Sequence, residues 1–183
     1  KEVTGLYLSL KGKLARLIVL DLDNTLWGGV AGDDGLEGIQ LGGDYPGNVF
    51  SQLQRLFKSY SQRGISLALC SKNNEEVALH IIDNHPEMIL TRDDFVTWKI
   101  NWNNKAQNIQ EICKTLNLGA YSLLFIDDNP VEREWVRSNI KDIVVPNLPP
   151  NISDWPRFIS SIPQLSIHNL SLEDVKRSKQ YKK

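Results

Sequence analysis

Cysteine is scarce in this sequence, with only Cys70 and Cys113 among 183 residues. Both lie inside apolar runs, so no disulfide framework is indicated, and a reducing intracellular compartment suits the chain. Basic residues are not in excess either, because 21 of them stand against 22 acidic residues and the net charge is -1. Nucleic-acid-binding proteins usually carry a basic surplus, so we expect no nucleic-acid partner.

Long hydrophobic runs are also missing. No stretch approaches the roughly 20 apolar residues that a membrane helix needs, and the N-terminus lacks the layout of a signal peptide. We therefore expect a cytoplasmic protein with no membrane partner. The chain opens within a pattern at Lys1 and stops at Lys183, so we expect a piece excised from a longer protein.

Short apolar runs alternate with amphipathic stretches along most of the chain. Buried strands are predicted at 16–22, 65–70 and 123–126, and helices at 49–60, 74–83, 106–116 and from 130 onward. Strands that alternate with helices predict a parallel sheet with helices on both faces. The residues expected to point inward from the helix that begins at 130 are Val131, Trp135, Val136 and Ile140.

Other segments have weaker patterns. Five glycines between Gly28 and Gly38, with a hairpin signal at Asp34-Gly35, predict a small flap. Further short strands are expected at 88–90 and 143–145. We assign 1–145 to one α/β domain and 146–183 to an irregular wrap, followed by a helix that starts at Ser171.

Acidic residues stand where strands end. Asp21 and Asp23 follow the first strand, and Asp127 and Asp128 follow a later one. In parallel sheets, ligands bind outside the carboxyl ends of the strands. Converging carboxylates repel each other unless a cation lies between them, and Mg²⁺ prefers such oxygen ligands and accompanies phosphates. For each pair taken alone, turn-forming or helix-capping aspartates are the alternative.

Two further residues fit phosphate chemistry. Ser71 follows the second strand, where its hydroxyl can bond a phosphoryl oxygen or simply cap a helix. Lys105 opens a helix, where an ammonium can neutralise a transferring phosphoryl group, although most lone lysines are solvated surface residues. An acidic pair, a hydroxyl, a lysine and a second acidic pair rarely occur in this order by chance. The set predicts magnesium-dependent phosphoryl transfer.

This order resembles the motif series of the haloacid dehalogenase (HAD) superfamily over residues 17–145. The resemblance implies a HAD-like Rossmannoid three-layer α/β/α sandwich. Asp21 would be the nucleophile that becomes an aspartyl-phosphate, and Asp23 the general acid and base. Asp21, the backbone carbonyl of Asp23, and Asp127 would hold Mg²⁺, supported by Asp128. The residues expected to bind substrate are Thr25, Ser71, Lys72, Asn73 and Lys105.

The amino-acid sequences of these motifs indicate a narrower family. They read DLDNTLWGG at 21–29, CSKN at 70–73, NWNNK at 101–105 and FIDDNPVE at 125–132. These segments resemble the FkbH-like family, which supplies glyceryl units to polyketide assembly lines. The resemblance implies that the chain takes a glyceryl group from 1,3-bisphosphoglycerate and loads it as a thioester on the phosphopantetheine arm of an acyl carrier protein. The HAD residues would remove the C3 phosphate.

Cys70 is a candidate relay thiol for that transfer, because it adjoins Ser71 and because Lys72 could lower its pKa. A small buried hydrophobe is an equally good interpretation, since strand alternation points Cys70 and Ser71 to opposite faces. The gaps at 25–71 and 105–127 leave no room for a large cap domain, so we expect a site open to a bulky partner.

Two other functions share these residues. A capless phosphatase acting on a sugar phosphate or a phosphoprotein would need neither Cys70 nor a carrier protein. A catalytically silent HAD fold used as a docking module would be expected to have lost Asp21 or Lys105, and both are present.

Overall fold

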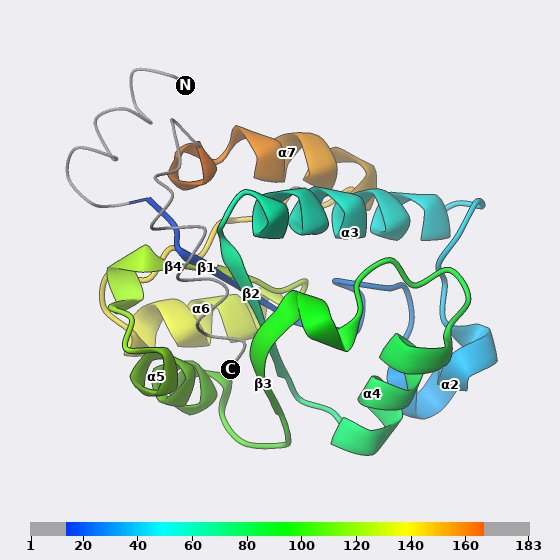
Figure 1. The fold of residues 1–183 in the computed structure, drawn as a ribbon, viewed down its shortest axis with the longest axis horizontal. Coiled ribbons are helices and arrows are strands. Elements are labelled where there is room, and N and C mark those ends of the chain that lie inside the picture. The colour runs from blue at the N-terminus through cyan, green and yellow to red at the C-terminus, as the bar shows by residue number, and fades with distance from the viewer. Residues whose placement is uncertain (1–13, 167–183) are drawn as a thin grey trace.

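The computed structural model describes residues 14–166, whose fold is shown in Figure 1. The strands of this part are β1 (Leu17–Leu20), β2 (Ser66–Ser71), β3 (Phe95–Ile100) and β4 (Leu123–Ile126). The helices are α2 (Ala31–Gly38), α3 (Gly47–Gln62), α4 (Glu75–Asn84), α5 (Lys105–Leu116), α6 (Pro130–Asn139) and α7 (Trp155–Ser161). The short 3-10 turns are η1 (Arg92–Asp94), η2 (Ala120–Ser122), η3 (Ile152–Asp154) and η4 (Pro163–Leu165).

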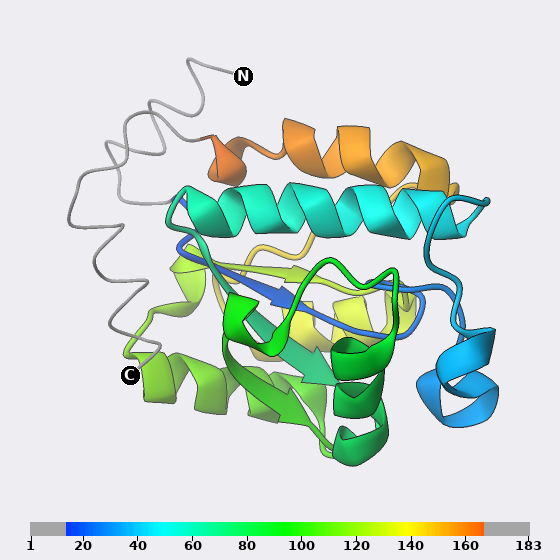
Figure 2. The same ribbon diagram turned by 45° about the vertical axis from the view of Figure 1, so that its right-hand side comes forward.

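The four strands form one parallel sheet in the order β3-β2-β1-β4. β1 is central, and its Leu17 lies level with Ser66 of β2 and Leu123 of β4. Helices α3 and α7 lie side by side over one face of the sheet, and α5 and α6 cover the other (Figures 1 and 2). The predicted parallel sheet between two helical layers is therefore confirmed.

Side-chain alternation along β1 divides the core in two. Ile18 and Leu20 pack in the cluster shared with α3, α4 and α7, whereas Leu17 and Val19 pack with α5 and α6. All four side chains are fully buried, as expected for a parallel strand with both faces covered. Asp21 is thus the first polar residue at the carboxyl edge of the sheet.

The prediction of a strand at 88–90 is wrong. The backbone N–H groups of Ile89 and Leu90 donate to Gln54 Oε1 at 2.9 and 3.1 Å, which ties this segment to α3 rather than to the sheet. The strand that fills the edge of the sheet is β3, paired with β2. Its four interior residues are only half-buried, so β3 lacks the apolar run on which the prediction relied.

The flap is present, but it is not the predicted hairpin turn. At its base, the backbones of Gly28 and Gln40 exchange two hydrogen bonds of 3.1 and 2.9 Å. Between them lies α2, which is interrupted at Gly35, where φ is 62°. This short helix is the whole insertion between β1 and α3, so the described residues contain no large cap over the sheet edge.

The segment after α6 differs from the prediction in two respects, because residues 143–145 form less strand than expected and residues 146–166 include a helix. Residues 143–145 contribute a single parallel bridge, between Leu124 and Val144, in place of a full strand. Farther along, α7 buries Trp155 and Ile159 in the same core as α3. The helix predicted from Ser171 lies outside the described residues.

Helix α6 faces solvent more than expected. Val136 and Ile140 are buried as predicted, but Val131 is 72% exposed and Trp135 is 49% exposed, so the prediction for these two residues is wrong. Among residues 14–166, no helix combines the length and apolar character needed to cross a bilayer.

Candidate active site

A cleft opens where β1 and β4 lie side by side at the carboxyl edge of the sheet. From here the chain leaves β1 toward α3 and leaves β4 toward α6, on the opposite face, and such switch points form crevices in parallel sheets. The cleft has a volume of about 220 Å³. Its lining residues are Asp21, Asp23, Asn24, Ser71, Lys72, Lys105, Asp128, Asn129 and Glu132.

An ion triad lies at the floor of the cleft. Lys105, the first residue of α5, places its Nζ 3.0 Å from Asp21 Oδ2 and 2.6 Å from Asp127 Oδ2. All three side chains are buried. Burial alone would lower the pKa of Lys105, but the charges of Asp21 and Asp127 outweigh burial and raise it. Lys105 is therefore a fixed positive charge beside the predicted nucleophile.

One ammonium cannot compensate all the carboxylates at this floor. Burial, followed by the charge of Asp21, raises the pKa of Asp127 to about 7. The same two causes raise the pKa of Asp128. The pKa of Lys105 is raised because carboxylates surround its ammonium group. The pKa of Asp127 is also raised, because that single positive charge is shared with Asp21 and does not offset the burial of Asp127. The floor of the cleft therefore has too few positive charges for its acids.

This deficit matches the requirements of a divalent cation. One oxygen from each of Asp21, Asp127 and Asp128 lies within 4.8 Å of the others. Asp21 Oδ1 is buried and has no hydrogen-bond partner among the described residues, which is costly unless a ligand completes it. A hard cation with oxygen ligands, such as Mg²⁺, fits this donor set.

Hydrogen bonds from several residues hold the loop between β4 and α6, which carries Asp127 and Asp128, in place. Arg133 Nη1 donates to the backbone carbonyls of Asp127 and Asp128, each at 2.7 Å. The backbone N–H of Asn129 donates to Asp127 Oδ1 at 2.8 Å, while the Asn129 side chain caps α6. Thr25 Oγ1 accepts the N–H of Asp128 at 3.1 Å, which joins this loop to the one after β1.

Asp23 is held separately from the metal cluster. Its Oδ1 accepts hydrogen bonds from Trp27 Nε1 and from the backbone N–H of Ala31, both at 3.0 Å, and its Oδ2 accepts one from Asn73 Nδ2 at 2.9 Å. Burial raises the pKa of Asp23, and the hydrogen bonds from Ala31 and Trp27 oppose that effect. A carboxyl group with a raised pKa that lines the cleft can act as a general acid.

Comparison with solved structures finds a close match. The N-terminal part of the protein BF1531 from Bacteroides fragilis, which contains a phosphatase domain and was solved in complex with Mg, is 42% identical, with a TM-score of 0.85. The match covers 91% of this chain. This chain therefore resembles a magnesium-bound phosphatase domain in sequence and fold, and the HAD-like α/β/α fold class predicted from its sequence is confirmed. The chain spans only 44% of the length of that relative, however.

Two further HAD-like neighbours are more distant. A haloacid dehalogenase-like hydrolase from Xanthomonas campestris is 13% identical, with a TM-score of 0.48 over 82% of this chain and 96% of its own. The 3-deoxy-D-manno-octulosonate 8-phosphate phosphatase from Moraxella catarrhalis is 18% identical, with a TM-score of 0.45 over 81% and 78%. Searches against protein-family models and curated proteins gave no match.

Some of the HAD residues predicted to bind substrate do line the cleft. Ser71 ends β2 and lines the cleft, as Lys105 does. Lys72 lies at the rim, where its Nζ is 2.5 Å from Glu132 Oε1 of α6. The others are elsewhere, because Thr25 bonds the β4–α6 loop and Asn73 bonds Asp23. Neither of these two residues is part of the cleft lining.

Cys70, the predicted relay thiol, is not brought to the HAD cleft. It has no exposed surface and packs under α5 with Ala68 and Ala106. Its Sγ lies 3.8 Å from the Lys105 carbonyl oxygen, and burial raises the pKa of the thiol well above its usual range. Alternation within β2 is the reason, because Ser71 takes the position that faces the cleft. This geometry gives the relay role no support.

Several residues of the site were not identified from the sequence. Asn24 lines the cleft with a φ of 54°, and its side-chain oxygen accepts the N–H of Gly29 at 3.0 Å. Arg133 and Trp27 act through their contacts with motif aspartates. Trp27 follows Asp23 by four positions, and Arg133 follows Asp128 by five, and that proximity is the only sequence signal we find.

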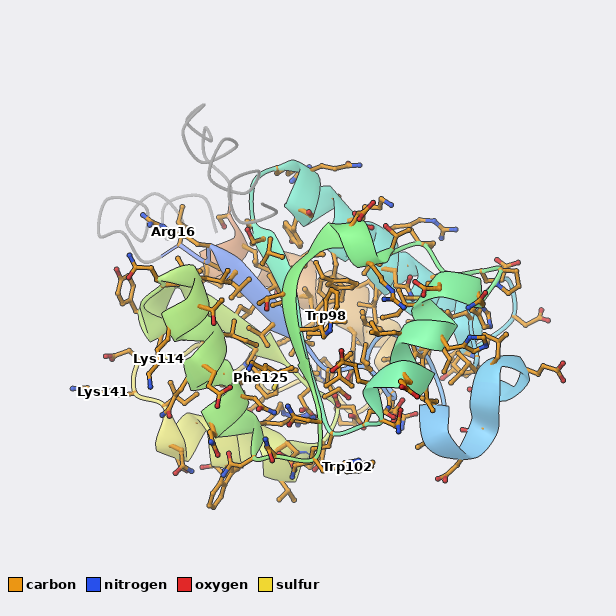
Figure 3. The ribbon with its side chains drawn as sticks, turned by 60° about the horizontal axis from the view of Figure 1, so that its bottom comes forward. Arg16, Trp98, Trp102, Lys114, Phe125 and Lys141 are labelled. Carbon is orange, nitrogen blue, oxygen red and sulfur yellow. The ribbon has the colours of Figure 1, made fainter. Side chains whose placement is uncertain are left out.

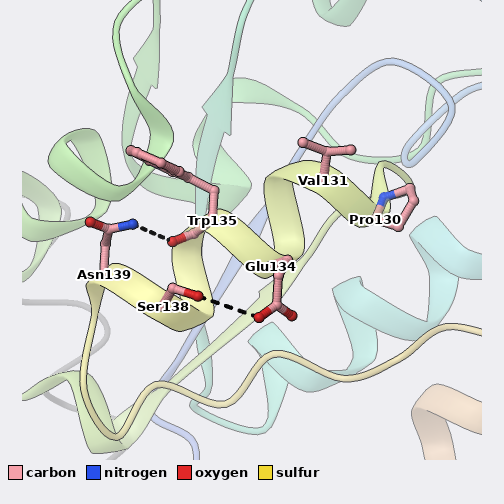
Figure 4. A pocket seen from close by; sticks show the side chains of 6 residues that line it. All are labelled: Pro130, Val131, Glu134, Trp135, Ser138 and Asn139. Carbon is pink, nitrogen blue, oxygen red and sulfur yellow. Dashed lines mark hydrogen bonds between the residues drawn. The ribbon is translucent and has the colours of Figure 1, made fainter.

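A larger pocket lies outside the HAD site. It has a volume of about 520 Å³ and is formed by one face of α6 (Figure 4). Its lining residues are Pro130, Val131, Glu134, Trp135, Ser138 and Asn139. Trp102, which is 74% exposed, lies at the outer edge of the molecule in Figure 3. The α6 pocket has a single acidic residue, Glu134, and thus lacks the group of converging carboxylates that the cleft contains.

Proposed function

We propose that this chain is a magnesium-dependent phosphatase that works through an aspartyl-phosphate on Asp21. The observation that supports this most strongly is the state of the Asp21 carboxylate. One of its oxygens is 3.0 Å from Lys105 Nζ, and the other is buried and has no hydrogen-bond partner within residues 14–166. Such a carboxylate needs a further positive ligand, and it lies in an open cleft. The similarity to a phosphatase domain solved with Mg supports the same function.

Asp21, Asp127 and Asp128 would hold the metal, with the backbone carbonyl of Asp23 as the fourth protein ligand that the family resemblance implies. When bound, Mg²⁺ would neutralise the negative charge that phosphoryl oxygens bring to this acidic floor. Lys105 would help to stabilise the same charge, because its ammonium group is fixed in the cleft by two buried carboxylates.

The chain's own residues divide the covalent chemistry into two steps. In the first, an Asp21 oxygen attacks phosphorus while the bond to the leaving oxygen breaks, and the Asp23 carboxyl gives that oxygen its proton. In the second, water attacks phosphorus, its proton passes to the Asp23 carboxylate, and the phosphorus bond to Asp21 breaks. Ser71 lines the cleft where its hydroxyl can bond a phosphoryl oxygen.

Asp21→Asn tests this function. The side chain keeps its shape and loses its nucleophilic charge, so we expect release of phosphate from 4-nitrophenyl phosphate with Mg²⁺ to be abolished while the thermal unfolding transition persists. Asp93→Asn, at an exposed position outside the cleft, is the matched control and should remain active. An Asp21→Asn protein that still turns over would show that the nucleophile is another residue.

We propose glyceryl loading as a second, narrower function, supported by the motif wording and by the absence of a large cap over the described cleft. An open cleft admits a long phosphopantetheine arm. The arm's thiol would attack C1 of 1,3-bisphosphoglycerate directly, since Cys70 is buried: the new C–S bond forms, the C1–O bond breaks, phosphate leaves, and the thiol proton goes to solvent. The C3 phosphate would then need Asp21.

Intact-mass measurement of the carrier protein tests glyceryl loading. The chain would be incubated with Mg²⁺, 1,3-bisphosphoglycerate made in place and a phosphopantetheinylated acyl carrier protein. We expect the carrier to gain one glyceryl group without phosphate. An unmodified carrier accompanied by free phosphate would leave the phosphatase function standing and remove the loading function.

A further inference from the structure

The Asp23 carboxyl receives three hydrogen bonds from three separate parts of the chain. Trp27 belongs to the loop after β1, Ala31 begins α2 in the flap, and Asn73 lies between β2 and α4. A general acid exposed in a cleft needs no such convergence, because one donor would suffice to satisfy each oxygen. The number and the origin of these bonds therefore indicate that the orientation of this side chain matters.

The chemistry of the donors fixes which oxygen can carry a proton. An indole N–H and a backbone N–H can only donate, so Asp23 Oδ1 has to accept from both and cannot itself bear the proton. On Oδ2, Asn73 provides a single hydrogen bond. The orientation of the Asn73 amide is also determined, because its Oδ1 accepts the N–H of Asn74 at 2.9 Å and its NH₂ group must face Asp23.

Both side-chain donors are buried. Trp27 has no exposed surface and Asn73 is 4% exposed. The indole packs in the core that includes Leu26 and Phe50, so its N–H cannot turn toward water. A displaced Asp23 carboxyl would leave the Trp27 N–H unpaired in that core, and this cost holds the carboxyl in one orientation.

From this geometry we infer that Trp27 and Asn73 are positioning residues for phosphoryl transfer, which clamp the Asp23 carboxyl so that Oδ2 alone presents the transferable proton to the leaving oxygen. This inference rests on the proposed phosphatase function. It assigns a chemical role to the tryptophan of DLDNTLWGG and to the asparagine of CSKN, whose side chains do not line the cleft.

The test uses two aryl phosphates that differ in their need for an acid. Phenyl phosphate has a poor leaving group and needs a proton as the P–O bond breaks, whereas 2,4-dinitrophenyl phosphate has a good one and does not. The first step is followed as single-turnover release of the phenol with Mg²⁺. Trp27→Phe keeps most of the packing and removes the donor, and Asn73→Leu removes the other donor from a separate loop.

Trp98→Phe is the matched control. Trp98 also donates its indole N–H to a carboxylate, Glu75 Oε1 at 3.1 Å, but this pair lies on β3 and α4 outside the cleft lining. We expect Trp27→Phe and Asn73→Leu to slow phenol release from phenyl phosphate by roughly tenfold to a hundredfold, the cost of a misplaced catalytic group. Release from the dinitrophenyl ester should be unchanged, and Trp98→Phe should alter neither rate.

The same substitutions in an Asp23→Asn background decide whether the effect passes through Asp23. If the clamp acts on that carboxyl, the double variants should be no slower on phenyl phosphate than Asp23→Asn alone. Equal losses on both esters, or losses that multiply with that of Asp23→Asn, would overturn the clamp and leave Trp27 a packing residue. Full activity of Asp23→Asn on phenyl phosphate would instead overturn the proposed role of Asp23 itself.

Discussion

At Asp127, burial and the charge of Asp21 favour the protonated carboxyl group, whereas the charge of Lys105 favours the carboxylate, so the state of this side chain depends on pH. The side chain has no exposed surface, and burial together with the charge of Asp21 raises its pKa from an ordinary 3.8 to about 7. A folded state that holds this proton more tightly than the unfolded state is stabilised below pH 4. That contribution is lost as the pH rises through 7. Asp127 should therefore destabilise the metal-free fold at neutral pH.

We predict that Asp127→Asn changes this pH dependence. In EDTA, the free energy of unfolding of the parent chain should fall between pH 4 and pH 7 relative to the variant, with a slope of at most about 1.4 kcal/mol per pH unit for one proton. The variant has no carboxyl to titrate at this position, so its curve should be flatter. Urea unfolding at several pH values provides the measurement. Parallel curves for the two proteins would show that Asp127 does not titrate in this range.

Some residues of the candidate site could be predicted from the sequence, and others could not. Asp21, Lys105 and Asp127 were predicted because acids and a lysine at strand ends and helix starts have few structural uses in such an order. The role of Cys70 could not be decided from the sequence, because it depends on which face of the sheet the side chain occupies at the end of β2. Trp27 is a fully buried core residue whose indole N–H also donates to Asp23, and hydrophobicity alone does not indicate that contact.

Among the elements, the loop from β4 to α6 carries two of the three acidic residues of the metal cluster, and one arginine holds it. Arg133 donates to the backbone carbonyls of Asp127 and Asp128, and its positive charge partly offsets that of the Asp128 carboxylate. We predict that Arg133→Met weakens Mg²⁺ binding by about tenfold, as substitutions behind metal ligands often do. Isothermal titration with Mg²⁺ measures the affinity directly.

Arg137→Met is the matched control on the same helix. Arg137 bonds the carbonyl of Val145 and the side chain of Asn147, away from the acidic loop. Its loss should affect stability while leaving the Mg²⁺ affinity unchanged. If both variants bound Mg²⁺ as tightly as the parent chain, the loop would be rigid without Arg133.

Elements with strong local signals were predicted and those defined by their neighbours were not. β1, β2 and β4 are buried runs, and α3, α4, α5 and α6 carry helical periodicity or an Asn cap, so local sequence was sufficient. β3 exists because the edge of β2 is available for pairing, and no local apolar run marks it. Similarly, α7 is a short helix whose position comes from packing against α3.

At the scale of the whole molecule, the fold concentrates negative charge at the carboxyl edge of the sheet. The sheet order places the ends of β1 and β4 together, and Lys105 at the start of α5 lines the resulting cleft, to which the flap contributes none of the lining residues. Three acids and one lysine lie at its floor, although the chain as a whole is nearly neutral, with a net charge of -1. The carboxylates at this floor therefore repel one another, and a bound cation would reduce that repulsion.

We predict that Mg²⁺ stabilises the whole fold and that the effect grows with pH. A ligand that binds only the folded state at a hundred times its Kd adds about 2.7 kcal/mol, which for a domain of this size raises Tm by roughly 5–10 °C. Because Asp127 has a pKa of about 7, the cation competes with a proton there, and the rise in Tm should be larger at pH 8 than at pH 5.

Thermal unfolding in Mg²⁺ and in EDTA, at matched ionic strength, measures this stabilisation. Asp128→Asn removes one acid of the cluster at a half-buried position and should reduce the rise in Tm, whereas Asp142→Asn, an exposed acid outside the cleft, should not. A rise of equal size in all three proteins would mean that Mg²⁺ acts as a general counterion. A rise confined to the chains with an intact cluster would show that the ion binds where the four strands of the sheet bring their carboxyl ends together.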